Sequence, residues 1–154
     1  MNIKSLLLAF SLLCSAFCTA QNNIFNKYED MEDVTTVYIS KAMLGIIPSV
    51  DGVGMNLKKL SGKLESLEIA TTKNIDRVAQ MRKDFSKLVS NKHEELMRIK
   101  DGKERVAFYT QKNGELLNDL LMLVDSDSSF TVIRIMGAIT LKELQDIAKN
   151  VDEK

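Results

Sequence analysis

The chain has 154 residues, 45% of them hydrophobic, and its 21 basic and 21 acidic side chains give a formal net charge of zero. This balance, without a long basic run, argues against nucleic acid as the main partner, because such binding depends on neutralising phosphates. The length suits one domain with its own hydrophobic core.

Residues 1–20 have the pattern of a secretory signal peptide. Lys4 precedes an apolar run that is too short to span a membrane. The run is followed by Cys18-Thr19-Ala20, which has small side chains at its first and third positions, as signal peptidase requires. We expect cleavage before Gln21 and a periplasmic or cell-envelope location for the exported chain.

A lipidated N-terminus is the alternative interpretation of this leader. Acylation needs a small residue directly before the cysteine, whereas Leu13 precedes Cys14 and Phe17 precedes Cys18. We therefore favour cleavage without lipidation. Both cysteines leave with the leader, so the exported chain would have no disulfide and no thiol for catalysis or metal binding.

The next part of the chain predicts a strand, a crossover and a second strand. Residues 21–33 are polar and place apolar side chains on one face of a short helix: Ile24, Phe25, Tyr28 and Met31. Strand signals follow at residues 34–41 and 64–71. Between them we expect a helical turn at 42–48, a loop at 50–54 and a short helix at 56–63. This order suggests that the two strands are parallel, with a right-handed connection.

Residues 74–92 predict the longest helix. Its apolar side chains recur every three or four residues and form one stripe: Ile75, Val78, Met81, Phe85 and Leu88. We interpret the stripe as a core face that packs on a sheet. A partner-binding groove is the alternative.

The second half predicts a four-stranded antiparallel meander. Asp101-Gly102 and Asn113-Gly114 have the composition of tight hairpin turns. Asp125-Ser126-Asp127-Ser128-Ser129 supplies a longer polar loop. The four strands expected around these turns are residues 95–100, 103–112, 116–124 and 130–136.

A helix is expected to close the chain. Thr140 and Glu143 form a capping box, in which each side chain binds the backbone amide of the other residue. Ile139 and Leu144 are placed as a hydrophobic staple. The predicted fold class is α+β: one domain over residues 34–154, with two layers, a mostly antiparallel sheet of about six strands, and helices on one face.

The sequence resembles a family of small exported bacterial proteins known as domain of unknown function 4252. The resemblance rests on Phe25-Asn-Lys-Tyr28, the strand that ends at Lys41, Lys100-Asp-Gly102 with Val106-Ala-Phe-Tyr109, and Ile133-Arg-Ile-Met-Gly137. It would cover residues 24–150. It implies an exported single-domain protein and supplies no catalytic residue.

Metal chemistry has little support in the sequence. Zinc and copper sites need several nitrogen or sulfur ligands, and His93 is the single histidine. The loop from Asp125 to Ser129 offers oxygen ligands for calcium, but Phe130 and Met136 stand where a calcium loop needs glycine and glutamate. We interpret this loop as a solvated turn, and we assign no metal and no cofactor.

Three other candidate sites have a plainer structural interpretation. A serine hydrolase would need His93 beside a serine such as Ser86 or Ser90, together with a carboxylate; we expect His93 to cap the long helix at its C-terminus instead. Val50-Asp-Gly-Val-Gly54 lacks the rest of a phosphate-binding motif and predicts a flexible connection. Glu94 and Glu95 are adjacent and are expected to point apart.

The sequence therefore predicts an exported, non-enzymatic binding protein of the cell envelope, of which envelope signalling is one form. We assign no catalytic, cofactor-binding or metal-binding residue. The partner would be an envelope protein or another macromolecule, bound by one face of the sheet or by an exposed strand. A hydrolase or a small-ligand-binding protein with a site of Asp, Glu, Ser and Tyr side chains is the alternative.

Overall fold

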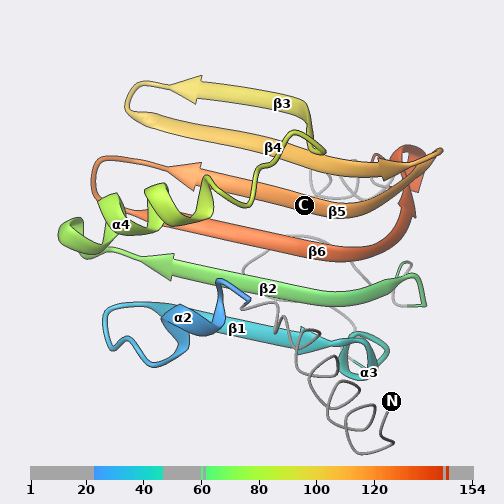
Figure 1. Cartoon of the computed structure of the whole chain (residues 1–154), viewed down its shortest axis with the longest axis horizontal. Helices are drawn as coiled ribbons and strands as arrows, with labels where there is room; N and C mark the ends of the chain where they lie inside the picture. Colours follow the sequence, from blue (N-terminus) through green and yellow to red (C-terminus); the bar gives the residue numbers. More distant parts are fainter. Residues whose placement is uncertain (1–22, 47–59, 61, 144, 146–154) are drawn as a thin grey trace, which may run out of the picture.

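The protein is built around one six-stranded sheet (Figure 1). The computed structural model describes residues 23–46, 60, 62–143 and 145. Its elements in chain order are α2 (Asn26–Glu29), β1 (Thr35–Ser40), α3 (Lys41–Leu44), β2 (Leu64–Thr72), α4 (Ile75–Phe85), β3 (Glu94–Asp101), β4 (Glu104–Asn113), β5 (Leu116–Asp125) and β6 (Phe130–Thr140). The expected leader, the loop at 50–54 and most of the helix expected at 56–63 lie outside the described residues.

The strand order is β1-β2-β6-β5-β4-β3, and every neighbouring pair is antiparallel. The predicted α+β class and the β3-to-β6 meander are confirmed. The parallel arrangement expected for the first two strands is wrong. Ser40, the last residue of β1, lies opposite Ser66, near the start of β2. The chain thus re-enters the sheet at the end where it left, and no crossover is made.

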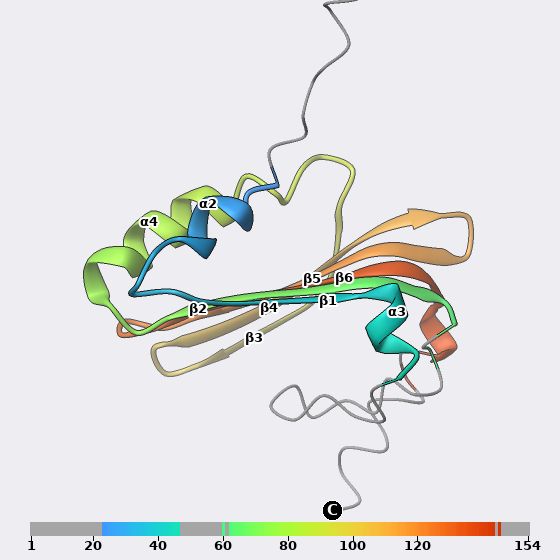
Figure 2. The same cartoon turned by 90° about the horizontal axis from the view of Figure 1, so that it is seen from below.

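The two faces of the sheet are covered by different helices. Helices α2 and α4 lie together on one face, here called the helical face, and the short α3 lies beyond the other face at one end (Figure 2). Alternation along the strands divides the side chains: Ala70 and Val132 pack toward α4, whereas Leu67 and Ile135 belong to a second buried cluster with Leu44 of α3. Each strand of the sheet centre is therefore buried on both faces.

Phe85 is the centre of the core under the helices. Its ring centroid lies 5.0 Å from that of Phe25, 5.3 Å from that of Tyr28 and 6.2 Å from that of Phe130. Phe25 and Tyr28 come from the segment around α2, and Phe130 begins β6. These aromatic contacts fix α2 and α4 on the sheet, and Tyr28 is fully buried. A short helix was expected within residues 21–33 and is found there.

Helix α4 is shorter than the sequence indicates. Asn74 caps its start, because its side-chain oxygen accepts from the amide of Asp76 at 3.0 Å. The helix ends at Phe85, where the Ser86 hydroxyl donates to the Lys83 carbonyl at 2.8 Å and the next amides bond at shorter sequence separation. The predicted stripe contributes Val78, Met81 and Phe85 to the core, whereas Ile75 is exposed.

The predicted turns and cap are confirmed in detail. Gly102 and Gly114 have φ angles of 55° and 64°, and they are the turn residues between β3 and β4 and between β4 and β5. The Glu143 amide donates to Thr140 Oγ1 at 3.3 Å, and the Thr140 amide donates to Glu143 Oε2 at 2.9 Å. The staple residue Leu144 lies outside the described residues. None of the described helices is long and apolar enough to cross a membrane.

Candidate partner and ligand site

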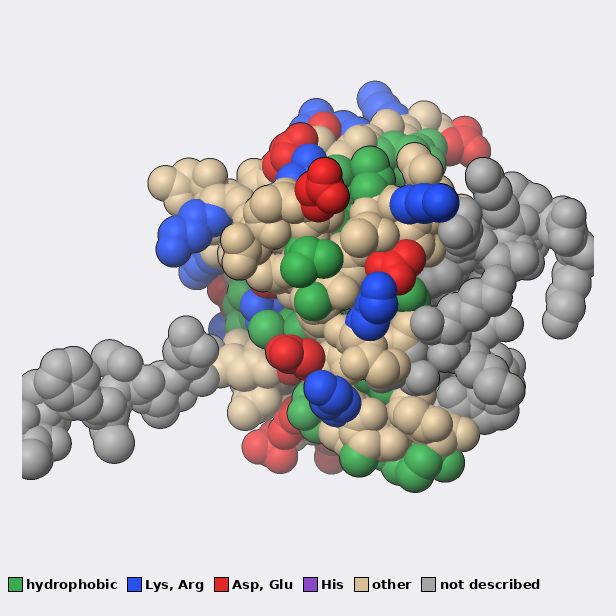
Figure 3. Space-filling view, turned by 90° about the vertical axis from the view of Figure 1, so that its right-hand side faces the viewer, with side chains coloured by type: hydrophobic (Ala, Val, Ile, Leu, Met, Phe, Trp, Pro, Cys, Tyr) green, Lys and Arg blue, Asp and Glu red, His purple; other side chains and the backbone are tan. Residues whose placement is uncertain are grey.

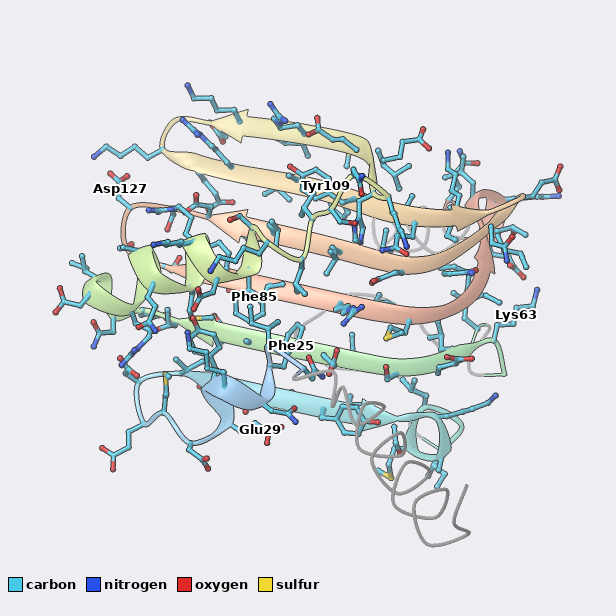
Figure 4. All side chains as sticks on the ribbon, in the orientation of Figure 1. Phe25, Glu29, Lys63, Phe85, Tyr109 and Asp127 are labelled. Carbon is cyan, nitrogen blue, oxygen red and sulfur yellow. The ribbon has the colours of Figure 1, made fainter. Side chains whose placement is uncertain are left out.

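A row of side chains crosses the helical face beyond the ends of the helices. Tyr38 on β1 lies opposite Glu68 on β2, Glu68 lies opposite Arg134 on β6, and that arginine lies opposite Leu121 on β5. The next residue in the row is Tyr109 of β4 (Figure 4). Residues paired in this way share a face, so four strands, β1, β2, β6 and β4, contribute polar groups to one row.

Arg134 holds a buried carboxylate in this row. Its Nε lies 3.0 Å from Asp119 Oδ1 and its Nη2 lies 2.7 Å from Asp119 Oδ2. Asp119 is only 6% exposed, so this two-bond pairing compensates the cost of burying its charge. The same hydrogen bonds, more than any other influence, raise the pKa of Arg134.

Glu68 is the second buried carboxylate and is less completely paired. It is 5% exposed, and its Oε1 accepts from the side chain of Asn23. Arg134 Nη1 lies 3.8 Å from Glu68 Oε2, too far for a hydrogen bond. No fully buried side-chain N or O atom of the described residues lacks a partner. Among the described residues, Glu68 Oε2 accepts no hydrogen bond, so it borders accessible space.

That space is a pocket of about 430 Å³ beside β1. Its lining combines polar groups of the row with apolar side chains. The lining residues are Asn23, Ile24, Tyr38, Ser66, Glu68, Leu88, Arg134 and Met136. Together with Asp119 directly behind Arg134, the site holds two carboxylates and one guanidinium, which favours a cationic or hydrogen-bond-donating guest.

His93 lies next to Asp119, the carboxylate that Arg134 binds. Its Nε2 lies 3.7 Å from Asp119 Oδ2, and its Nδ1 lies 3.1 Å from both the amide nitrogen and the hydroxyl of Ser90. The imidazole is 3% exposed. The helix C-terminal cap expected of His93 is wrong, because α4 ends at Phe85 and His93 lies in the segment just before β3. Ser86 remains at the helix end, where it binds Lys83.

The acidic groups singled out from the sequence are paired with cations. Asp125 accepts three hydrogen bonds from Arg82, and Asp127 lies 2.7 Å from Lys103 Nζ. The hydrogen bond from Lys103 is the main cause that lowers the pKa of Asp127. No cluster of three or more metal-binding side chains occurs in the part of the chain that the structure describes.

The adjacent acidic pair on β3 is split between the two faces, as expected. Glu94 lies opposite Thr110 and pairs with Lys112 at 2.7 Å, whereas Glu95 lies opposite Tyr109 and pairs with Arg98. These carboxylates do not converge on one site.

The two edge strands of the sheet differ in character. β1 has no charged residue, and its Val37 and Tyr38 side chains are 39% and 63% exposed. β3 has five charged residues in eight and an irregular register between Glu95 and Met97. Charges and bulges protect an edge from strand pairing, so within the described sheet β1 is the receptive edge.

The comparisons with known proteins place the chain in a family. The family model described as "Domain of unknown function (DUF4252)" matches residues 28–147. The chain belongs to this family. No curated protein and no solved structure matches it. The family match includes Tyr38, Glu68, Asp119 and Arg134, so the whole row lies within the family domain. Of the pocket-lining residues, Asn23 and Ile24 precede the match.

Sequence reasoning missed the principal residues of this candidate site. Glu68, Asp119 and Arg134 each interrupt an apolar strand at a position that alternation assigns to a buried face. An ionisable residue at such a position is a usable signal, because buried charges are normally paired. Which charges meet depends on strand order, which local patterns do not specify.

Proposed function

We propose that this protein is an exported, non-enzymatic binding protein of the cell envelope that receives an extended, basic segment of a partner protein along β1. The signal-peptide pattern of residues 1–20 supports export. The observation that carries the binding mode is the position of the uncharged β1 edge beside a pocket in which Glu68 Oε2 accepts no hydrogen bond from any residue that the structure describes.

An extended partner segment would add a seventh strand to the sheet. Backbone groups on the outer side of an edge strand have no ladder partner, and an added strand satisfies them without any change in the fold. The exposed Val37 and Tyr38 side chains would cover the new strand on its two faces. Main-chain bonds supply affinity in this mode, and side-chain pockets supply specificity.

The pocket specifies a basic side chain in that segment. A residue opposite Tyr38 on the added strand would lie two strand spacings from Glu68, roughly 10 Å. A lysine or arginine side chain spans this distance when it lies over the Tyr38 ring and ends in a hydrogen bond to Glu68 Oε2. The aromatic face attracts the cation, and the carboxylate provides a charge-assisted bond.

The proposal can be tested with selected peptides. A random peptide library displayed on phage is panned on the purified protein, and the selected peptides are measured by calorimetry against Glu68→Gln. We expect a basic residue in the selected sequences. We expect affinity to fall by about tenfold or more in Glu68→Gln, since one charge-assisted hydrogen bond contributes about 1.5–3 kcal/mol.

Matched variants separate the site from general charge effects. Glu65→Gln removes the same charge from an exposed position on β2 and should bind like the parent protein. Val37→Lys should block the β1 edge, whereas Ile99→Lys makes the same kind of change on β3 and should have no effect. Selected peptides without a basic residue, or equal losses in Glu65→Gln and Glu68→Gln, would refute the proposal.

A hydrolase is the second candidate, because the His93 ring contacts the Ser90 hydroxyl through one nitrogen and lies near Asp119 through the other. The ring nitrogen that faces the Ser90 hydroxyl also accepts the Ser90 amide, which is the geometry of a closed turn. We therefore prefer the binding function. Ester hydrolysis by the purified protein that disappears in both Ser90→Ala and His93→Ala, with unchanged melting curves, would favour the hydrolase instead.

A further inference from the structure

A second pocket lies at the opposite end of the helical face, between α4 and the tip of the β3–β4 hairpin. Its volume is about 450 Å³. It is lined by Arg82, Lys100, Gly102, Lys103, Arg105, Asp125, Ser126 and Asp127. Four cationic and two anionic side chains give this lining a formal charge of +2. In the middle of the hairpin tip, Gly102 has open space around its α-carbon.

Two of the cations are placed against each other. Lys100 on β3 lies directly opposite Arg105 on β4, so both side chains emerge on the same face as neighbours. Like charges in this position destabilise a sheet. Neither residue has an ion pair with any residue that the structure describes.

The nearest carboxylates are already engaged. Asp125 is the cross-strand neighbour of Arg105 on β5, but both of its oxygens accept from Arg82 of α4 at 2.6–2.9 Å. Asp127 pairs with Lys103. The charges of Lys100 and Arg105 are therefore the excess positive charge of the pocket.

We propose that this second pocket is a binding site for a phosphate-type oxyanion, with Lys100 and Arg105 as its principal ligands. A tetrahedral anion between them replaces repulsion by two charge-assisted contacts, and the planar guanidinium of Arg105 suits two of its oxygens. The anion is either a soluble phosphate compound or the phosphate of a lipid headgroup. This site is separate from the β1 edge and does not depend on the proposed peptide binding.

The test is a phosphate titration followed by amide NMR. Inorganic phosphate is added to the ¹⁵N-labelled protein at constant ionic strength, maintained with sodium chloride. We expect saturable shifts of the Gly102 and Ser126 amides. The shifts should be lost in the double variant Lys100→Gln/Arg105→Gln, whose exposed positions allow the fold to persist. Absence of the shifts in the parent protein would overturn the proposal.

A matched charge variant and two vesicle types complete the design. Lys41→Gln/Lys73→Gln removes the same charge from exposed positions outside the pocket and should keep the phosphate response. Equal loss of response in both double variants would overturn the proposal. Sedimentation with phosphatidylglycerol vesicles, compared with phosphatidylcholine vesicles, identifies the source. Binding to phosphatidylglycerol vesicles that Lys100→Gln/Arg105→Gln abolishes indicates a lipid headgroup. A response to inorganic phosphate without binding to either vesicle type indicates a soluble phosphate compound.

Discussion

Tyr28 on α2 donates its phenolic hydrogen to Asp84 on α4, with 2.8 Å between Oη and Oδ2. Lys27 binds the same carboxylate, and Lys87 lies 3.3 Å from its other oxygen. Asp84 thus joins the two helices on the outer side of the aromatic core. Hydrogen bonds from Lys27, then Tyr28 and Lys87, lower the pKa of Asp84 to about 2 from 3.8.

Asp84→Asn should lower the free energy of unfolding at pH 7 by about 1.5–3 kcal/mol, the contribution of a hydrogen bond to a charged group. Because the folded-state pKa is depressed, this stability is present above pH 3.8 and is lost as the pH falls through about 2. Urea unfolding measured between pH 7 and pH 2 should give unfolding free energies for the parent protein and for Asp84→Asn that converge as the pH falls. Asp30→Asn, at an exposed position, is the control. A difference in unfolding free energy between the parent and Asp84→Asn that stays constant from pH 7 to pH 2 would contradict the lowered pKa of Asp84.

Arg134→Met should destabilise the protein by about 3 kcal/mol, because it leaves the buried Asp119 charge without its partner. We take the lower end of the usual range because the Arg134 side chain is 21% exposed. The double variant Arg134→Met/Asp119→Leu should regain much of the lost unfolding free energy, since an apolar pair can replace a buried ion pair. Denaturant unfolding of both single variants and the double variant measures the coupling. Simple additivity of the two losses would contradict a buried pair.

Gly137→Ala should be destabilising by about 1–3 kcal/mol, the cost of forcing an extra methyl group into a packed site. A Cβ at this position would lie 2.6 Å from the Lys63 carbonyl oxygen and 2.9 Å from the Leu64 Cα. Gly62→Ala adds the same group where nothing lies within 4 Å and serves as the control. Thermal melts of the two variants should differ clearly, and equal melting temperatures would rule out the close approach.

Thr140→Ala should cost about 1 kcal/mol, because it removes the hydroxyl that accepts the Glu143 amide. Thr140→Ser keeps this hydroxyl and should retain most of the stability. Urea unfolding of the three proteins provides the comparison. If the serine variant is as unstable as the alanine variant, the loss comes from the missing methyl group and not from the cap.

The exported protein should begin at or near Gln21 and carry no lipid. Intact-mass measurement and N-terminal sequencing of protein recovered from the cell envelope decide the point. A diacylated species that begins at Cys14 or Cys18 would overturn both the cleavage position and the export route that we propose.

The elements that the sequence predicts well are those governed by local interactions. The turns at Gly102 and Gly114 need positive φ angles, and the cap at Thr140 uses residues three positions apart. Alternation places Leu67 and Ala70 on opposite faces of β2 without knowledge of the neighbouring strands. Such features depend on a few consecutive residues, so the meander and the closing cap could be derived before the structure.

The remaining features depend on contacts between distant segments. The direction of β2 relative to β1 depends on where the chain re-enters the sheet, and the end of α4 depends on side-chain and turn bonds that periodicity does not reveal. The candidate site is the clearest case. Glu68, Asp119 and Arg134 come together only because β6 lies between β2 and β5. A reader of the sequence could suspect each charge alone but could not pair them.

The position of β6 also sets the order in which the protein can fold. β6 is the last strand among the described residues, yet it is an inner strand that joins the β1–β2 pair to the β5–β4–β3 group. Until β6 arrives, β2 and β5 each present an open inner edge and lack the buried side chains that β6 supplies, Val132, Ile133 and Ile135 among them. A late segment therefore completes the middle of the sheet, and contacts between segments so distant in sequence favour slow folding.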